Sequence, residues 1–241
     1  MKAYGLTDRG CVRSENQDRF RIVEGEGYAL AVVCDGMGGA KAGSVAAELA
    51  VESFTSYLHR CMLEKEPIES GIMLRESASY ANIRVYDKSR ESEEYEGMGC
   101  TLVAALVRDR SVTLINIGDS RCYHFSRRGL RRLTVDHSLV EEMVRAGEIS
   151  REEARNHPQK NVITQAVGLE YRLHGDIFYP EIKPGEVLLL CSDGLSNMLD
   201  KKCMEAVLYD EPDIEKAAEK LMELALKAGA SDNVTVLLLT L

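Results

Sequence analysis

Residues 28–36 read YALAVVCDG, an apolar, strand-like run that stops at Asp35. The arrangement recurs as VTLINIGDS at 112–120, which stops at Asp119, and as EVLLLCSDG at 186–194, which stops at Asp193. Asp232 stands directly before a fourth run, NVTVLLLTL at 233–241. Three aspartates therefore close a strand and the fourth opens one, so an antiparallel sheet would collect all four at one edge.

Four carboxylates at one edge need counter-charges, because neighbouring carboxylates repel each other unless cations hold them. A single Asp-Gly or Asp-Ser pair is more typical of a turn. Four repeats, three of them with Gly beside Asp, favour an oxygen-ligand site instead. Such a site suits Mg²⁺ or Mn²⁺, which prefer carboxylate, carbonyl and water to sulfur.

The rest of the hydrophobic pattern predicts an α+β protein built on antiparallel sheets rather than on βαβ units, because strands come in blocks separated by long helices. Strands are expected at 2–8, 18–24, 28–34, 99–107, 111–117, 120–126, 173–179, 186–191 and 233–240. Helices are expected at 42–63, 68–90, 138–146 and 214–228. With no linker or internal repeat, we predict one domain, 1–241.

Composition excludes several classes of protein. The net charge of −9 leaves no basic stripe for nucleic acid, and the short basic run at 127–132 is interpreted as a hairpin with a solvated turn or, as the minority hypothesis, an acidic-partner docking patch. Seven cysteines without a Cys-x-x-Cys pair predict neither a disulfide framework nor a zinc site. Without a signal core or an apolar stretch of about 20 residues, we expect no membrane insertion and a cytoplasmic location.

Two polar segments carry further hypotheses. The segment 147–176 is weakly periodic, and it is either a functional flap or a plain surface insertion. Residues 13–18 read RSENQD, just before a strand. Arg13 there is suited to hold a phosphate by a bidentate fork, although a surface salt bridge is the commoner role of an isolated arginine. The glycines at 36–39 allow close approach to a ligand but form no P-loop.

Taken together, these motifs resemble the PPM family, the type-2C metal-dependent protein serine/threonine phosphatases, in their short bacterial form. The resemblance spans nearly the whole chain, and its motifs stand in family order. They are Arg13-x-x-Asn16-x-Asp18, Asp35-Gly36-Met37-Gly38-Gly39, Gly99-Cys100-Thr101, Gly118-Asp119-Ser120-Arg121, Asp136-His137-Ser138, His157-Pro158, Asn161-Val162-Ile163-Thr164, Ser192-Asp193-Gly194 and Asp232-Asn233.

The resemblance implies a four-layer α-β-β-α sandwich, two antiparallel sheets flanked by helices, with the metal centre at one end. By analogy, Asp35 bridges two Mn²⁺ or Mg²⁺ ions, Gly36 offers its carbonyl to one, and Asp193 and Asp232 complete the other. Asp119 would share a third, weaker ion with Asp193.

The same resemblance assigns the remaining roles. Arg13 would grip the substrate phosphate, and Asp18 would orient metal-bound water. The segment 147–176 would be the flap that borders the active site and touches protein substrates. Met37 stands where many members have a His that can act as general acid, which leaves the proton donor open among metal-bound water, His137 and His157. Ala40 replaces a His that is frequent in bacterial relatives.

The function expected from the resemblance is hydrolysis of phosphoserine and phosphothreonine by metal-activated water. We expect a monomer that acts on phosphorylated proteins, namely a bacterial Ser/Thr kinase and its targets. Two alternatives stay open. One is a pseudophosphatase that serves as a binding module, and the other is a metal-dependent hydrolase of nucleotides or small phosphoesters.

Overall fold

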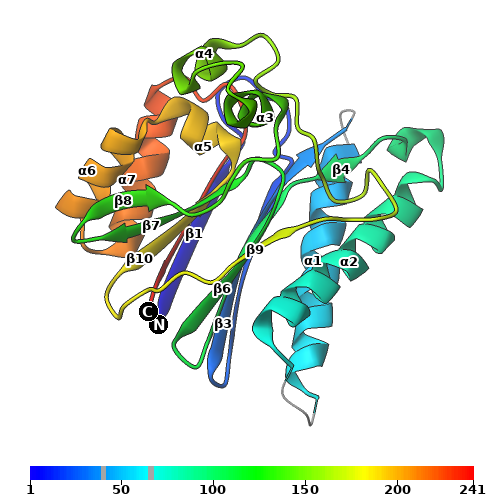
Figure 1. Cartoon of the computed structure of the whole chain (residues 1–241), viewed down its shortest axis with the longest axis horizontal. Helices are drawn as coiled ribbons and strands as arrows, with labels where there is room; N and C mark the ends of the chain where they lie inside the picture. Colours follow the sequence, from blue (N-terminus) through cyan, green and yellow to red (C-terminus); the bar gives the residue numbers. More distant parts are fainter. Residues whose placement is uncertain (39–41, 65–67) are drawn as a thin grey trace.

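The computed structural model describes residues 1–38, 42–64 and 68–241 and contains two antiparallel sheets packed face to face (Figure 1). The first sheet has the order β1 (Lys2–Asp8), β11 (Val234–Thr240), β10 (Val187–Cys191), β7 (Arg121–Ser126), β8 (Gly129–Arg132). The second has the order β2 (Asp18–Gly25), β3 (Tyr28–Met37), β5 (Leu102–Arg108), β6 (Ser111–Ile117), β9 (Asp176–Phe178), and β4 (Gly99–Cys100) pairs with β3.

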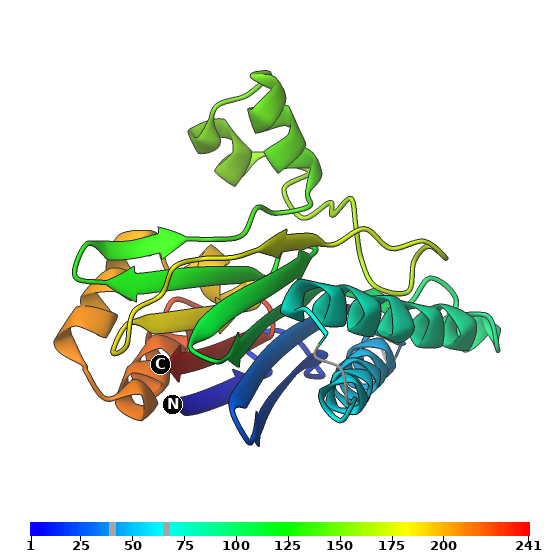
Figure 2. The same ribbon diagram turned by 60° about the horizontal axis from the view of Figure 1, so that its bottom comes forward.

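Helices cover both outer faces of this sandwich. The pair α1 (Ala42–Met62) and α2 (Ser70–Ser89) packs on the β3 sheet, followed by the short 3₁₀ helix η1 (Glu93–Tyr95). The other sheet is covered by α5 (Asp193–Met198), α6 (Lys201–Asp210) and α7 (Ile214–Lys227). A separate pair, α3 (Leu139–Ala146) and α4 (Arg151–Asn156), projects beyond one end of the sheets (Figure 2). The predicted α-β-β-α sandwich is confirmed.

The apolar run of β3 lies at the centre because both of its faces are buried. Leu30, Val32 and Cys34 pack toward α1, whereas Ala29, Ala31 and Val33 pack against the opposite sheet. A strand buried on both faces reads as a continuous apolar run without polar alternation. The small side chains on the inner face let the two sheets approach each other.

Several expected elements differ from the structure. The predicted strand 99–107 is interrupted at Thr101, and 173–179 contains only the three residues of β9. The basic run 127–132 is part of the β7–β8 hairpin, as predicted. The segment 147–176 includes α4, and its later part is not a simple surface loop, because Ala166, Val167 and Gly168 are buried against β4 and α2.

The topology brings the aspartate-bearing segments to one end of the sandwich. In the second sheet β3 and β6 both run antiparallel to β5, so their carboxyl ends lie at the same end. In the first sheet β10 ends where β11 begins. The opposite end holds the two chain termini, since Lys2 pairs with Thr240 (Figure 1). Within the described residues, every helix is too short or too polar to cross a bilayer.

Candidate functional site

Asp18 and Asp35 face each other across β2 and β3, as directly paired residues of the antiparallel ladder. Asp18 is 0% exposed, and its Oδ2 accepts hydrogen bonds from Ser192 Oγ at 2.7 Å and Thr235 Oγ1 at 2.6 Å. Thr235 lies in β11 of the other sheet and Ser192 directly follows β10 of that sheet, so one buried carboxylate links the two sheets. Like charges placed directly opposite on neighbouring strands repel each other.

The other three aspartates come from different elements at the same end. Asp119 lies in the bend after β6, Asp193 is the first residue of α5, and Asp232 lies two residues before β11. Together with Asp35 they are partly exposed, in contrast to Asp18 behind them. The four therefore meet between the ends of two sheets, and the simpler expectation of one edge of a single sheet was wrong.

The pKa values show how strongly these carboxylates act on each other. Burial raises the pKa of Asp35 well above its ordinary value, and the charges of Asp18, Asp193, Asp119 and Asp232 raise it further. Burial, together with Asp193 and Asp232, raises the pKa of Asp18 to about 7 against the lowering effect of its two hydroxyl partners.

The pKa values of Asp119 and Asp193 are raised as well. Burial and then Asp193 and Asp136 raise the pKa of Asp119 to about 7. Burial and then Asp232 raise the pKa of Asp193. The cluster thus resists carrying its full negative charge at neutral pH unless positive charge is brought to it.

Two observations test whether a hard cation suits this place. Asp18 Oδ1 and Asp193 Oδ1 are buried and have no hydrogen-bond partner in the part of the chain that the structure describes. Buried carboxylate oxygens are costly to leave unpaired. The donors are all oxygen, as Mg²⁺ and Mn²⁺ prefer. No three His, Cys, Asp or Glu side chains among the described residues already stand as a ligand set, so the fit rests on oxygen chemistry and unpaired atoms.

Arg13 supplies a positive charge at the edge of the cluster. Its Nη2 contacts Asp232 Oδ2 at 2.7 Å, and its side chain is 55% exposed. This hydrogen bond to Asp232 raises the pKa of Arg13. The salt-bridge hypothesis for Arg13 therefore describes the present contact, but the partner is a predicted metal ligand.

The loop that carries Arg13 is held by Asn233. Its side-chain amide donates to the Arg9 carbonyl at 2.9 Å and to the Glu15 carbonyl at 2.8 Å, and its Oδ1 accepts the Gln17 N–H at 2.8 Å. Asn233 is buried and follows Asp232 directly, so one short segment fixes both a predicted ligand and the predicted phosphate-binding loop.

The glycines beside the aspartates have packing reasons to be glycine. A Cβ at Gly36 would lie 2.1 Å from the Gly43 carbonyl oxygen, and one at Gly194 would lie 1.9 Å from the Asn233 carbonyl oxygen. Asp35 and Gly36 lie inside β3, and Asp193 opens a helix, so neither Asp-Gly pair is a turn. Gly39 and Ala40 lie outside the described residues.

Several residues without a predicted role support the cluster. Thr101 Oγ1 accepts the Asp35 N–H at 3.0 Å and lies 2.7 Å from Ser120 Oγ, next to Asp119. Ser192 and Thr235 hold Asp18. Ser120, Ser192 and Thr235 lie within three residues of a predicted ligand, but their pattern alone gave no sign of which carboxylate they would bind.

The candidate proton donors other than water make structural contacts. His137 Nδ1 accepts the Gly118 N–H at 3.2 Å, and its Nε2 lies 3.3 Å from Asp176. His157 Nδ1 accepts the Gln159 N–H at 3.2 Å. Met37, at the end of β3, has no acidic proton to give.

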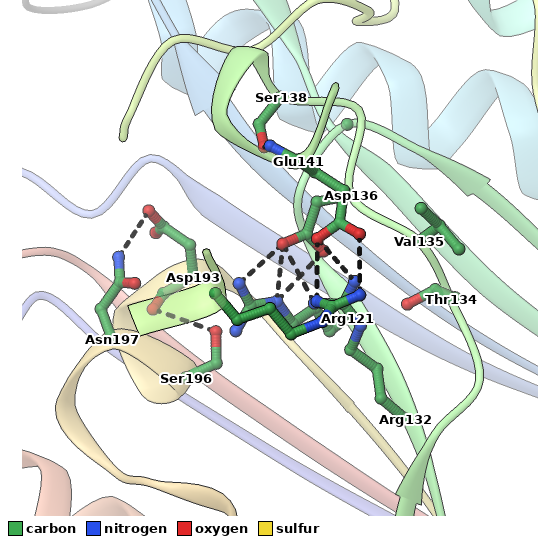
Figure 3. Close-up of polar contacts among 12 residues, drawn as sticks. Arg121, Arg132, Thr134, Val135, Asp136, Ser138, Glu141, Asp193, Ser196 and Asn197 are labelled. Carbon is green, nitrogen blue, oxygen red and sulfur yellow. Dashed lines mark hydrogen bonds and ion pairs between the residues drawn. The ribbon is translucent and has the colours of Figure 1, made fainter. Parts of the chain in front are cut away.

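A ladder of alternating charges joins the α3–α4 pair to the first sheet, near Asp193 (Figure 3). Asp136 accepts from Arg121 at 2.6 Å and from Arg132 at 3.3 Å. Arg132 also contacts Glu141 at 3.4 Å, and Arg151 of α4 contacts Glu141 at 3.2 Å. Asp136 and Glu141 are buried, so these carboxylates depend on their arginine partners.

Two hollows flank the sandwich. The larger, about 830 Å³, is lined by Asp119 and Asp193 and extends under α3 and α4. The smaller, about 550 Å³, lies between β2, α1 and α2 and touches none of the predicted site residues. The larger hollow is therefore the one connected with the carboxylate cluster.

Comparison with known proteins gives a consistent result. The family model described as protein phosphatase 2C matches residues 12–235. The serine/threonine phosphatase stp of Listeria monocytogenes is 39% identical over 241 residues, covering 99% of this chain and 95% of that protein.

Solved structures agree with the sequence comparison. The crystal structure of serine/threonine phosphatase Stp1 from Staphylococcus aureus superposes with a TM-score of 0.90 at 37% identity, covering 100% of this chain and 94% of the other. The catalytic domain of the phosphatase PstP, solved in complex with 2 manganese ions, has a TM-score of 0.84 at 31% identity and covers 98% and 96%.

Proposed function

The chain belongs to the protein phosphatase 2C family and is a metal-dependent protein serine/threonine phosphatase, and we propose that its five clustered aspartates and Arg13 form the catalytic site. Asp35 would bridge two Mn²⁺ or Mg²⁺ ions, with the Gly36 carbonyl as a further ligand of one and Asp193 and Asp232 as ligands of the other. Asp119 would share a third, weaker ion with Asp193. When bound, the two core ions lower the pKa of water and offset the charge of the phosphoryl group.

Arg13 binds the phosphoryl oxygens of the substrate in this proposal. It stands at the rim of the cluster, and its contact with Asp232 is available for exchange once cations neutralise that carboxylate. A guanidinium matches the geometry of phosphate oxygens with two parallel hydrogen bonds. It would then stabilise the equatorial oxygens during transfer to water.

Asp18 acts as the orienting residue behind the ligands. Its Oδ2 is fixed by Ser192 and Thr235, while its Oδ1 has no partner among the described residues. A carboxylate held in this way can accept a hydrogen bond from water and fix its orientation. No covalent intermediate is needed, because water is the attacking group.

The observation that carries the proposal is the set of clustered aspartates whose pKa values are raised first by burial and then by the charges of the neighbouring aspartates. Such a set destabilises the metal-free fold, and carboxylates with perturbed pKa values cluster at functional sites. A phosphatase centre with two cations would use this negative charge, and Arg13 beside it would bind the phosphate.

The test is an assay of the metal-stripped protein on a phosphothreonine peptide, before and after addition of Mn²⁺ or Mg²⁺. Activity that appears only with metal supports the proposal, and the Asp35→Asn protein serves as the inactive control. Metal binding without turnover on any phosphoester would favour the pseudophosphatase instead. Nucleotides that are hydrolysed in preference to the peptide would favour the small-molecule hydrolase.

The proposed partners are phosphorylated proteins, among them a Ser/Thr kinase and that kinase's targets. The phosphatases similar to this chain act, by their names, on phosphoserine or phosphothreonine. We also propose a cytoplasmic monomer of one domain. Phosphoproteomics of a deletion strain would identify the targets, and analytical ultracentrifugation would measure the oligomeric state.

A further inference from the structure

The larger hollow is a cleft that begins at the carboxylate cluster. Its volume is about 830 Å³, and it runs from Asp119 and Asp193 between β7–β8 and the α3–α4 pair to the start of α6. Figure 3 shows the arginines and carboxylates of this region around Asp193. A cleft that begins at the candidate phosphate site is placed to receive the chain on one side of a phosphorylated residue.

Six cations and five carboxylates line the cleft: Arg121, Arg132, Arg151, Arg155, Lys160 and Lys201, against Asp119, Asp136, Glu141, Asp193 and Asp200. Arg121, Arg132 and Arg151 are engaged by Asp136 and Glu141. Three further cations line the cleft, and none of them has an ion-pair partner among the residues described: Arg155, Lys160 and Lys201. Asp119 and Asp193 are proposed metal ligands, so once metal neutralises them the six cations of the cleft face three remaining carboxylates, Asp136, Glu141 and Asp200.

The free cations stand on opposite walls. Arg155 and Lys160 belong to α4 and the turn after it, and Lys201 opens α6. The lining of the cleft also includes apolar residues, among them Val140 and Val144 of α3 and Met204 of α6. A cleft that combines unpaired cations with apolar residues suits an extended peptide with anionic side chains.

We propose that this cleft binds the substrate segment next to the phosphorylated residue and selects segments with anionic side chains. The inference rests on the proposed phosphatase function and adds a substrate class to it. The anion is a carboxylate of Glu or Asp, or the phosphoryl group of a second phosphorylated residue. The same three cations would attract either one.

The first experiment compares matched phosphothreonine peptides on the Mn²⁺-loaded wild-type protein. One peptide has three Glu before the phosphothreonine, one has three Glu after it, one has Gln at all six positions, and one carries a second phosphothreonine. We expect kcat/KM for the best anionic peptide to exceed that of the Gln peptide about fivefold, because exposed ion pairs each contribute modestly. The preference should shrink at high salt.

The second experiment assigns the preference to the cleft. Lys160→Glu and Lys201→Glu should each reduce the ratio of anionic to neutral kcat/KM by about threefold. Lys202→Glu is the matched control, because Lys202 is exposed on the same helix and does not line the cleft. It makes the same charge change and should keep the wild-type ratio.

The outcomes separate this inference from the function on which it rests. Equal kcat/KM for all four peptides, with activity present, would overturn the cleft proposal and leave the phosphatase intact. An equal loss of preference in Lys202→Glu would also overturn it, because the effect would then be one of general charge. Absence of activity on every peptide and on an aryl phosphate would mean that the proposed function itself had failed.

Discussion

At the scale of single residues, the site depends on carboxylates that are unfavourable neighbours. Asp35 lies opposite Asp18, and the charges of Asp193, Asp119 and Asp232 also raise its pKa. The aspartates occupy different local structures, since Asp18 and Asp35 lie in strands, Asp119 follows a strand in a bend, Asp193 opens a helix and Asp232 precedes a strand. Substitutions should therefore have different effects, which makes the proposed roles separable.

Asp35→Asn should reduce turnover by more than about a hundredfold and sharply weaken metal binding, because a single carboxylate is proposed to serve two cations. Isothermal titration with Mn²⁺ and a phosphopeptide assay measure the two effects. Asp193→Asn and Asp232→Asn should be less severe, since each leaves the bridge in place. Retention of wild-type activity in Asp35→Asn would refute the assignment.

Arg13→Ala should raise KM about tenfold or more while the metal content stays unchanged, because a charged hydrogen bond to the phosphoryl group is lost. Steady-state kinetics and metal analysis of the same preparation provide the measurement. Loss of metal would instead give Arg13 a structural role through its contact with Asp232. An unchanged KM would reduce it to a surface charge.

Asp119→Ala should still bind two Mn²⁺ by calorimetry but turn over a phosphopeptide about a hundredfold more slowly, as expected when protonation of the leaving group is impaired. Met37 gives no proton in this chain, so the Asp119 side of the cluster is where we place that step. An aryl phosphate should suffer less, because phenolate departs with little help from an acid. Equal losses on both substrates would disprove the proton-donor role.

At the scale of secondary-structure elements, the projecting pair α3–α4 is held by charge rather than by an apolar core. Glu141 is buried and is shared by Arg132 of β8 and Arg151 of α4. The helices themselves are well delimited, since Ser138 and Ser150 cap their first turns. Glu141 thus ties both helices to the first sheet, alongside backbone hydrogen bonds such as that from the Leu139 N–H to the Val162 carbonyl.

Glu141→Gln should weaken that attachment and raise amide hydrogen exchange in 139–156 about tenfold, while the exchange of β3 stays as in the wild type. Glu142→Gln is the control, because Glu142 is exposed on the same helix and forms no ion pair in the described structure. Unchanged exchange in Glu141→Gln would show that backbone contacts alone hold the pair.

The long, strongly patterned elements were predictable from sequence, whereas several of the short ones were not. The apolar runs of β3, β6, β10 and β11 and the periodic helices α1, α2 and α7 match the prediction closely. The helices α4, α5 and α6 were missed, because their short sequences show no clear helical period. The equally short α3 was predicted at 138–146, because its apolar residues recur at helical spacing.

The candidate site was also predictable only in part. The positions of the aspartates at strand ends were predictable because strand direction is fixed by the fold. The hydroxyl partners of Asp18 were not, since Ser192 and Thr235 reach it across the gap between two sheets. The contact of Arg13 with Asp232 spans 219 positions in sequence, which no local pattern encodes.

At the scale of the whole molecule, the carboxylate cluster should make the metal-free protein sensitive to pH. The pKa values of Asp18 and Asp119 are about 7 in the folded protein and near 4 when unfolded. The folded state thus binds more protons between these values, so its free energy of unfolding falls as pH rises from about 4 to 7.

Urea unfolding in EDTA should therefore show one cooperative transition with a lower midpoint at pH 7.5 than at pH 5.5. Mn²⁺ should restore the midpoint at pH 7.5 by binding only the folded state. Asp119→Asn should flatten the pH dependence of the metal-free protein, because it removes one of the titrating groups. A higher midpoint at pH 7.5 without metal, or two separate transitions, would contradict the expectation.

The pairing of β1 with β11 also determines how the molecule responds to mechanical force. Lys2 lies opposite Thr240, so both ends of the chain leave the sheet at the same place, and the ladder then runs inward to Asp8 and Val234. Hydrogen bonds between antiparallel strands lie perpendicular to the strands. Tension between the two ends acts along these bonds and loads one pair at a time, so the strands unzip rather than shear. Unzipping reaches the segment next to Asp232 last, so the end of this seam that carries the proposed catalytic site is the last part to open under tension.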